Sequence, residues 1–144
     1  MLLFYGVIPV CLTYYVQAGT VTATTAWISV ALGLLSVNIL LVNNVRDQEQ
    51  DAAAGKRTTV VRFGRPFGTT LYLVCAVLAV ACSWPAYFYR GAYTWLLFLI
   101  FLAFELVTWH DLRRLSGSDL NRVLGLTARN IWIYTLLLVS LLAF

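Results

Sequence analysis

Residues 26–45 read AWISVALGLLSVNILLVNNV and contain no charged side chain. A helix needs about 20 predominantly apolar residues to cross the hydrocarbon core of a bilayer, which is about 30 Å thick. This stretch therefore predicts a membrane-spanning helix. Four further apolar stretches, of which the first is the shortest, predict the other spans: residues 2–16, 68–89, 92–109 and 123–144. The sequence thus predicts an all-α, polytopic transmembrane helix bundle of about five spans, in one domain over residues 1–144.

The composition of the chain agrees with a membrane protein. Of its 144 residues, 61% are hydrophobic and 11% are charged, and the mean hydropathy is +0.82. A soluble protein carries about 25% charged residues, and a small soluble domain cannot hide so much apolar surface. A soluble enzyme and a disordered chain are therefore excluded. The net charge of +4 indicates no nucleic-acid partner, because the charges lie in short segments between apolar stretches, and the lipid bilayer is the expected surrounding.

Basic residues are concentrated in two of the connections between the spans. Residues 43–66 and 110–122 hold eight of them: Arg46, Lys56, Arg57, Arg62, Arg65, Arg113, Arg114 and Arg122. Alternating spans place these two connections on the same side of the membrane. Because cytoplasmic loops carry an excess of Lys and Arg, we expect a multi-pass protein of the cell membrane with the Asp-rich loop, residues 43–66, on the cytoplasmic side.

This loop carries a pattern of charge that indicates chemistry. Residues 43–64 read NNVRDQEQDAAAGKRTTVVRFG, in which Asp47 and Asp51 are four residues apart. On a helix this spacing puts both carboxylates on one face, where their mutual repulsion favours a bound cation. Mg²⁺ suits such a pair, because it prefers one or two carboxylates together with water and phosphate oxygens.

Cationic side chains follow the two carboxylates. Lys56, Arg57 and Arg62 are suited to binding phosphate oxygens, and Arg binds them in bidentate fashion. Gly55 permits a sharp turn between the acidic and the basic residues. The segment therefore predicts a diphosphate site at the membrane surface.

The alternative is a solvated connector, in which exposed ion pairs contribute almost nothing and the DxxxD spacing arises by chance. Asn43 and Asn44 favour a site, because paired amides at a membrane boundary are costly unless they hydrogen-bond. On the connector interpretation the chain is a small, non-catalytic membrane protein.

The same segment resembles the second Asp-rich motif of the UbiA-type intramembrane aromatic prenyltransferases. Within that superfamily it is most similar to the 1,4-dihydroxy-2-naphthoate polyprenyltransferases of menaquinone biosynthesis. The residues that match the motif are Asn43, Asn44, Arg46, Asp47, Asp51, Gly55, Lys56 and Thr58. Residues 60–64 match its usual continuation, residues 9–19 resemble the preceding span, and residues 119–128 resemble the opening of the last span.

The resemblance implies helices five to nine of a nine-helix bundle, which is the C-terminal half of such an enzyme. The family carries two Asp-rich motifs that face each other across a central cavity, whereas the residues before Asn43 contain no Asp or Glu. We therefore expect an N-terminal half with the first motif as a partner. A truncated, inactive prenyltransferase is the alternative.

The resemblance also implies a reaction and its residues. A polyprenyl group passes from polyprenyl diphosphate to 1,4-dihydroxy-2-naphthoate with Mg²⁺ as cofactor and loss of CO₂, giving demethylmenaquinone; another aromatic acceptor is the alternative. Asp47 and Asp51 are implied as catalytic metal ligands, with Lys56 as a further catalytic residue. The implied diphosphate ligands are Arg46, Lys56, Arg57 and Arg62. The implied supporting residues are Asn43, Asn44 and Asn121.

Other polar residues of the spans favour a structural interpretation. Glu105 and His110 lie near the end of the fourth span, where a carboxylate reaches the interface or pairs with Arg113 or Arg114. Arg129 either faces the cavity or begins the last helix. A second enzyme class that places aspartates in membranes, the CDP-alcohol phosphotransferases, is disfavoured because the chain lacks their Asp-Gly start and fixed aspartate spacing.

Overall fold

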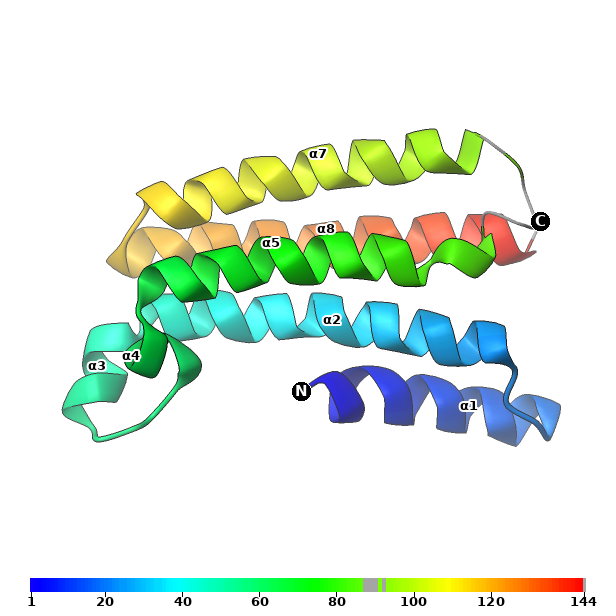
Figure 1. Cartoon of the computed structure of the whole chain (residues 1–144), viewed down its shortest axis with the longest axis horizontal. Coiled ribbons are helices and arrows are strands. Elements are labelled where there is room, and N and C mark those ends of the chain that lie inside the picture. The colour runs from blue at the N-terminus through cyan, green and yellow to red at the C-terminus, as the bar shows by residue number, and fades with distance from the viewer. Residues whose placement is uncertain (87–90, 92, 144) are drawn as a thin grey trace.

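The computed structural model describes residues 1–86, 91 and 93–143, which form helices joined by short turns (Figure 1). The four long helices are α2 (Ala23–Arg46), α5 (Arg65–Cys82), α7 (Tyr93–Arg114) and α8 (Leu120–Ala143). Among the described residues, four helical segments are long and apolar enough to cross a membrane, one at each of these helices. No strand occurs among the described residues. The expected all-α polytopic bundle is confirmed.

The first predicted span, residues 2–16, is shorter than a bilayer core. Its place is taken by η1, a π-helical segment (Leu3–Val7), and α1 (Ile8–Ala18), which have five and eleven residues. At 1.5 Å per residue these reach about 24 Å, against about 30 Å for a bilayer core. Figure 1 shows the N-terminus about halfway along α2. The five predicted spans are therefore four long helices and one shorter apolar helix.

The predicted boundary between the third and fourth spans lies at residues 89–91. The third span extends as helix α5 to Cys82, with a further turn to Ala86. Residues 87–90 and 92 are outside the described residues, so the predicted turn and the adjoining ends of spans 68–89 and 92–109 lie there too.

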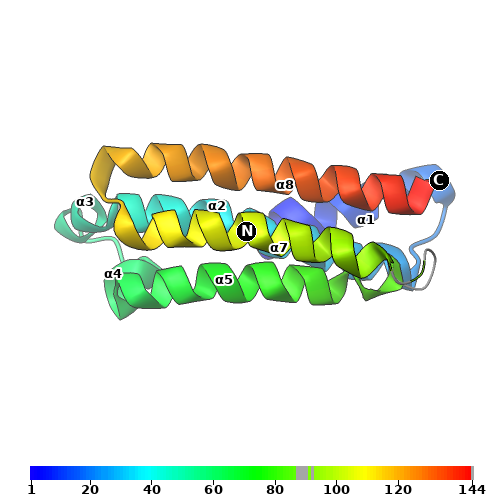
Figure 2. The ribbon, with the colours of Figure 1, turned by 90° about the horizontal axis from the view of Figure 1, so that it is seen from above.

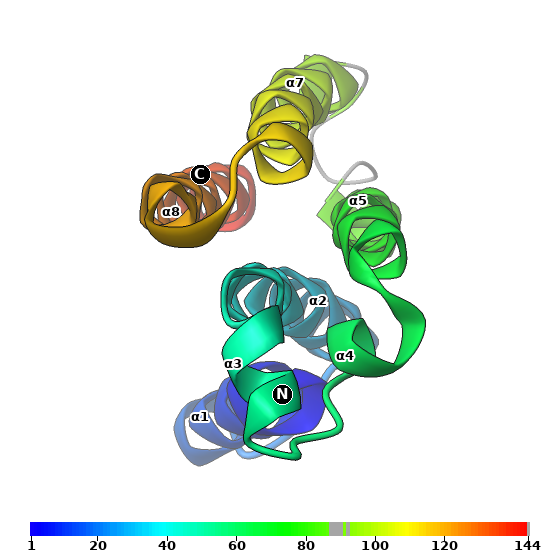
Figure 3. The same ribbon diagram turned by 90° about the vertical axis from the view of Figure 1, so that its left-hand side faces the viewer.

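The two basic connections lie at the same end of the bundle, as expected. Beyond α2 the chain forms two short helices, α3 (Gln48–Ala53) and α4 (Thr59–Phe63), and η2, a 3₁₀ turn (Gly117–Asp119), leads from α7 into α8. Figures 1 and 3 show these segments together at one end, whereas the turn between α1 and α2 lies at the other. The cytoplasmic orientation of the basic end stays a prediction.

The long helices run side by side over their whole length (Figure 2). α2 packs against α5 and α8, and α7 contacts both α5 and α8. Apolar side chains between these helices form two clusters. One includes Leu35, Phe101 and Leu138, and the other, nearer the basic end, includes Leu41 and Val123.

Two glycines bring the N-terminal helix close to α2. A Cβ atom added at Gly6 would lie 2.3 Å from the Cα atom of Gly33, and one added at Gly33 would lie 2.7 Å from the carbonyl oxygen of Leu2. This separation leaves no room for a side chain, and small residues permit such close approach between membrane helices. In the same contact, Sγ of Cys11 lies 3.5 Å from Oγ of Ser29.

We predict that Gly6→Ala separates the N-terminal helix from α2, because the added methyl group overlaps the backbone of Gly33. Oxidative cross-linking of Cys11 to a cysteine introduced by Ser29→Cys measures the contact, with the linked peptides identified by mass spectrometry. We expect a several-fold lower yield in Gly6→Ala. Gly125→Ala is the matched control, since a Cβ atom at this helical glycine meets nothing within 4 Å. Equal yields in the two variants would contradict the prediction.

Candidate functional site

The Asp-rich motif lies just beyond the last turn of α2. This helix ends at Arg46, and Asp47 joins it to α3, on which Asp51 lies. The amide N–H of Asp51 donates to the carbonyl oxygen of Asp47 at 2.8 Å, which places the two residues one helical turn apart. The spacing expected from the sequence is therefore present, with Asp51 buried and Asp47 partly exposed.

Arg46 and Asp47 form a bidentate ion pair. Nε of Arg46 donates to Oδ1 of Asp47 at 2.7 Å, and Nη2 donates to Oδ2 at 2.8 Å. Nη1 of Arg46 donates to Oδ1 of Asn121 at 2.8 Å, so the first turn of α8 orients the guanidinium. The hydrogen bonds from Arg46 lower the pKa of the Asp47 carboxyl below its ordinary value, because they stabilise its charged form.

Asp51 is paired with Lys56 through a tight turn. Gly55 has a φ of +71°, a conformation that costs glycine little, and the chain reverses there. Nζ of Lys56 donates to Oδ1 of Asp51 at 2.7 Å, and the backbone N–H of Lys56 donates to the Asp51 carbonyl at 2.9 Å. The hydrogen bond to Asp51 raises the pKa of Lys56. Because the side chain of Asp51 is 10% exposed and that of Lys56 is 65% exposed, the lysine covers the carboxylate on its solvent side.

The other predicted ligands surround these two ion pairs without joining them. Arg57 and Arg62 are exposed, and the guanidinium of Arg62 lies 5.7 Å from the ring centroid of Phe63. Asn43 and Asn44 are half-buried in the last turn of α2, and no hydrogen bond joins their side chains to another described residue. These amides and guanidiniums are therefore available to a ligand.

The donor set fits a divalent cation that also binds substrate oxygens. Among the described residues no three His, Cys, Asp or Glu side chains gather at one point, so Asp47 and Asp51 are the carboxylates that the motif supplies. Mg²⁺ takes one or two carboxylates and completes its coordination with water and phosphate oxygens. Arg46 bonds both carboxylate oxygens of Asp47, whereas Lys56 bonds one oxygen of Asp51. A metal ion at Asp47 would compete with Arg46, and a diphosphate would offer that guanidinium another anion.

A layer of polar side chains crosses the bundle between the two apolar clusters, and the sequence motifs do not reveal it. The hydroxyl groups of Tyr72 and Thr127 lie 3.1 Å apart and join α5 to α8. Nδ2 of Asn130 donates to Oγ1 of Thr108 at 3.0 Å and joins α8 to α7. The signal in the sequence is a set of isolated polar residues within apolar stretches, whose mutual contacts depend on how the helices are arranged.

Glu105 belongs to this layer, and its predicted surroundings are wrong. The sequence predicts a carboxylate that reaches the interface or pairs with Arg113 or Arg114. Instead, Glu105 is fully buried, and neither of its carboxylate oxygens hydrogen-bonds to another described residue. The reason is that Glu105 lies on the inward face of α7, whereas both arginines are exposed at the end of that helix.

Arg129 and His110 lie outside the Asp-rich motif. Nη2 of Arg129 donates to Oδ1 of Asn130 at 3.0 Å, and its guanidinium lies 5.4 Å from the ring centroid of Phe104. Arg129 therefore links α8 to α7 within the third turn of α8 and does not begin the helix. His110 is exposed near the end of α7.

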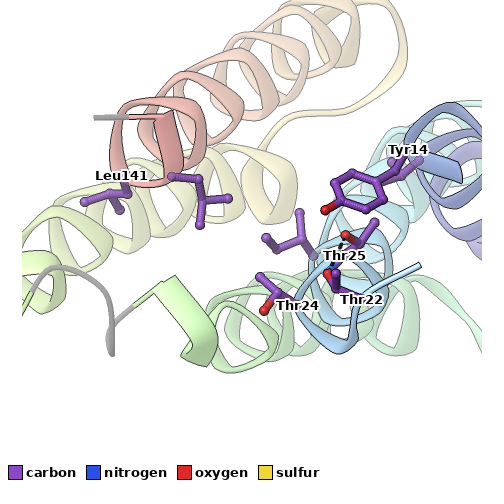
Figure 4. Close-up of a pocket in the computed structure, with 8 residues that line it drawn as sticks. Tyr14, Thr22, Thr24, Thr25 and Leu141 are labelled. Atoms are coloured by element: carbon purple, nitrogen blue, oxygen red, sulfur yellow. Dashed lines mark hydrogen bonds between the residues drawn. The ribbon is translucent and has the colours of Figure 1, made fainter. Parts of the chain in front are cut away.

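A pocket of about 620 Å³ lies at the opposite end of the bundle, between α1, α2 and the end of α8. Tyr14 and three threonines, Thr22, Thr24 and Thr25, line one side of it, and Leu141 lies across from them (Figure 4). No charged residue lines this pocket. It therefore lacks the charged groups that favour a metal ion or a diphosphate, and the Asp-rich end remains the candidate site.

The fold and the site together define a polytopic helical membrane protein that presents paired carboxylates and cations at one end of its bundle. The UbiA prenyltransferase family matches residues 1–134, and the chain belongs to this family. No solved structure matches the chain.

Three curated relatives illustrate the extent of the similarity. The 1,4-dihydroxy-2-naphthoate octaprenyltransferase of Haemophilus influenzae is 34% identical over 110 residues, which cover 76% of the chain and 35% of the relative. The enzyme of the same name from Mycobacterium tuberculosis is 41% identical over 78 residues, covering 54% of the chain and 26% of the relative. The mouse UbiA prenyltransferase domain-containing protein 1 is 32% identical over 91 residues, covering 58% and 27%. The chain thus spans about a third or less of the length of these relatives.

We predict that Arg46→Gln raises the pKa of the Asp47 carboxyl toward its ordinary value of about 3.9, because the hydrogen bonds from Arg46 are the main cause of its lowering. A carbon-13 NMR titration of Asp47 in detergent micelles measures the change. Lys56→Gln is the control, since Lys56 is the weakest of the influences on Asp47. An Asp47 pKa that stays low in Arg46→Gln would contradict the assignment.

The same shift fixes the sign of a pH effect on stability. A carboxyl group whose pKa is lowered by folding stabilises the protein above its unfolded pKa and loses that contribution as the pH falls through the folded pKa. The stabilisation by the Arg46–Asp47 pair is therefore complete above about pH 4 and is lost progressively below it, as the pH falls through the lowered pKa of Asp47. In Arg46→Gln this part of the acid destabilisation should be absent.

We also predict that Thr127→Val destabilises the bundle by about 1 kcal/mol, the scale of a hydrogen bond between membrane helices. Thr127 and Thr135 each donate to a backbone carbonyl of α8 at 2.9 Å, but Thr127 also contacts Tyr72 on α5. Thr135→Val is therefore the matched control, and we expect it to have almost no effect. Reversible unfolding by SDS in mixed micelles measures both variants, and equal effects would show that the link to Tyr72 contributes nothing.

Proposed function

We propose that this chain binds the diphosphate of a polyprenyl donor and contributes to prenyl transfer onto an aromatic ring. The observation that carries the proposal is the pair of carboxylates, Asp47 and Asp51, one helical turn apart, each with its own cation, at the end of the bundle in a UbiA-family chain. A solvated connector has no need of a buried aspartate such as Asp51.

In the proposed mechanism Asp47 and Asp51 hold Mg²⁺, which when bound neutralises the diphosphate and stabilises the departing pyrophosphate. Arg46 and Lys56 leave the carboxylates and donate hydrogen bonds to phosphate oxygens, Arg46 in bidentate fashion. Arg57 and Arg62 add positive charge at the entrance. Asn43 and Asn44 donate hydrogen bonds to the carboxylates or to water, and Asn121 orients Arg46.

The proposed acceptor is 1,4-dihydroxy-2-naphthoate. The prenyl group takes the place of the ring carboxylate, which leaves as CO₂, while pyrophosphate leaves the donor. The product keeps the hydroquinone oxidation level of the acceptor and is the reduced form of demethylmenaquinone. Support comes from the relatives that are named 1,4-dihydroxy-2-naphthoate octaprenyltransferase. Another aromatic acceptor is the alternative, because residues of the acceptor pocket are not among those that the motif defines.

We further propose that the complete catalytic unit contains a second set of carboxylates from polypeptide outside these residues. The support is that two carboxylates serve the motif here and that the relatives are about three times as long as the matched segment. The proposed location is the cell membrane with the Asp-rich end toward the cytoplasm, as the distribution of Lys and Arg favours.

The test is prenyl transfer by the chain together with the rest of its catalytic unit, with and without Mg²⁺, after Asp47→Asn or Asp51→Asn. We expect each variant to lose activity by on the order of 100-fold or more, because each removes a charge that binds the metal. Asp119→Asn is the matched control, since Asp119 is an exposed aspartate of the other connection at the same end. Full activity of the Asp47→Asn and Asp51→Asn variants would contradict the assignment of these residues as metal ligands. Transfer to 4-hydroxybenzoate in preference to 1,4-dihydroxy-2-naphthoate would contradict the proposed acceptor.

A further inference from the structure

A second basic site lies between α5 and α7, separate from the Asp-rich motif. It is a pocket of about 370 Å³ lined by Arg65, Pro66, Thr69, Thr70, Trp109 and Arg113. None of these residues is acidic, and none belongs to residues 43–64. Two guanidinium groups therefore border one pocket that contains no carboxylate.

The fold holds both arginines in place. Nη2 of Arg65 donates to the carbonyl oxygen of Leu112 at 2.8 Å, which ties the start of α5 to the end of α7. The guanidinium of Arg113 lies 4.8 Å from the ring centroid of Trp109, and Nε1 of Trp109 donates to the carbonyl oxygen of Thr69 at 2.9 Å. Groups that are already fixed lose little conformational entropy when a ligand binds.

Neither guanidinium has a counter-ion within the part of the chain that the structure describes. The ion pairs there are those of Asp47 and Asp51 with their own cations. Nη1 and Nε of Arg65 donate no hydrogen bond to another described residue. Because like charges that border one pocket repel each other at low dielectric, the pocket favours an anion with several oxygen atoms.

Among such anions, the position of the pocket favours the phosphate group of a lipid. The pocket lies where α5 begins and α7 ends, at the basic end of the bundle (Figure 1), and Trp is enriched at the membrane–water interface. Val74, one turn along α5 from Thr70, is 43% exposed. Leu106, two turns before Arg113 on α7, is 48% exposed. An acyl chain below the head group therefore meets an apolar surface on both helices.

We propose that this pocket binds the head group of an anionic phospholipid. Arg65 and Arg113 donate hydrogen bonds to the phosphate oxygens, and the hydroxyl of Thr70 adds a third donor. Basic pockets between spans at this depth bind anionic head groups in the same way. The site is independent of the proposed reaction, since it shares no residue with the Asp-rich motif.

The test is lipid retention by the purified full chain in native mass spectrometry, with phosphatidylglycerol or phosphatidylcholine added. Arg113→Gln is the informative variant, because Arg113 does not hold a helix terminus as Arg65 does. Arg114→Gln is the matched control, since it removes the same charge from the next residue, outside the pocket. We expect phosphatidylglycerol to bind about tenfold more weakly to Arg113→Gln, the effect of one charge-assisted hydrogen bond, and the control to change by less than about twofold.

Several outcomes would overturn the proposal. Equal weakening in the two variants would mean a diffuse attraction to the basic end, and unchanged binding in Arg113→Gln would mean that the pocket is not the site. If inorganic phosphate in detergent displaces the lipid, and loses this ability in Arg113→Gln, the ligand is a soluble phosphate. Should Arg113→Gln lose helicity by circular dichroism, Thr70→Val decides in its place, with a loss of a few-fold expected for phosphatidylglycerol and none for phosphatidylcholine.

Discussion

The hydrocarbon core of a membrane contains no water, so a polar side chain that joins two helices of this bundle requires a partner side chain on the facing helix. Tyr72 and Thr127 satisfy this requirement between α5 and α8, as Asn130 and Thr108 do between α8 and α7. A small slide of one helix along another would disturb the close packing of the apolar side chains and break these hydrogen bonds of about 3 Å. The polar layer therefore contributes to the register between the helices, and the arrangement of the basic end depends on that register.

At the basic end the charges are arranged in two opposite ways. Asp47 and Asp51 each have a cation within hydrogen-bond distance, so the motif is electrically balanced before any ligand arrives. Arg65 and Arg113 converge without an acidic residue, so their pocket carries uncompensated positive charge. A ligand of the first site competes with existing ion pairs, whereas a ligand of the second adds a missing countercharge. This difference separates a site suited to a substrate that comes and goes from one suited to a resident lipid.

The sequence was sufficient for those features that depend on local pattern. Length and hydropathy identified the long helices, and the four-residue spacing of Asp47 and Asp51 became one turn of α3, because both features depend on neighbours in the chain. The burial of Glu105 could not be predicted, since it depends on which face of α7 turns inward. Asn121 was expected to support the motif because it matches a family pattern. Its contact with Arg46, 75 residues away in sequence, could not be predicted, because it depends on the arrangement of α2 beside α8. The roles of the motif in binding metal and diphosphate stay predictions.

Arg46 donates hydrogen bonds both to Asp47 and to Asn121. An anion that draws the guanidinium away from the carboxylate also breaks the link between the end of α2 and the first turn of α8. Occupancy of the Asp-rich site and docking of the last helix are therefore thermodynamically linked, and by reciprocity whatever loosens α8 must alter the affinity for the anion by the same factor. Through the side chain of Arg46, the start of α8 thus responds to anion binding at the Asp-rich loop, which precedes it by about half the chain.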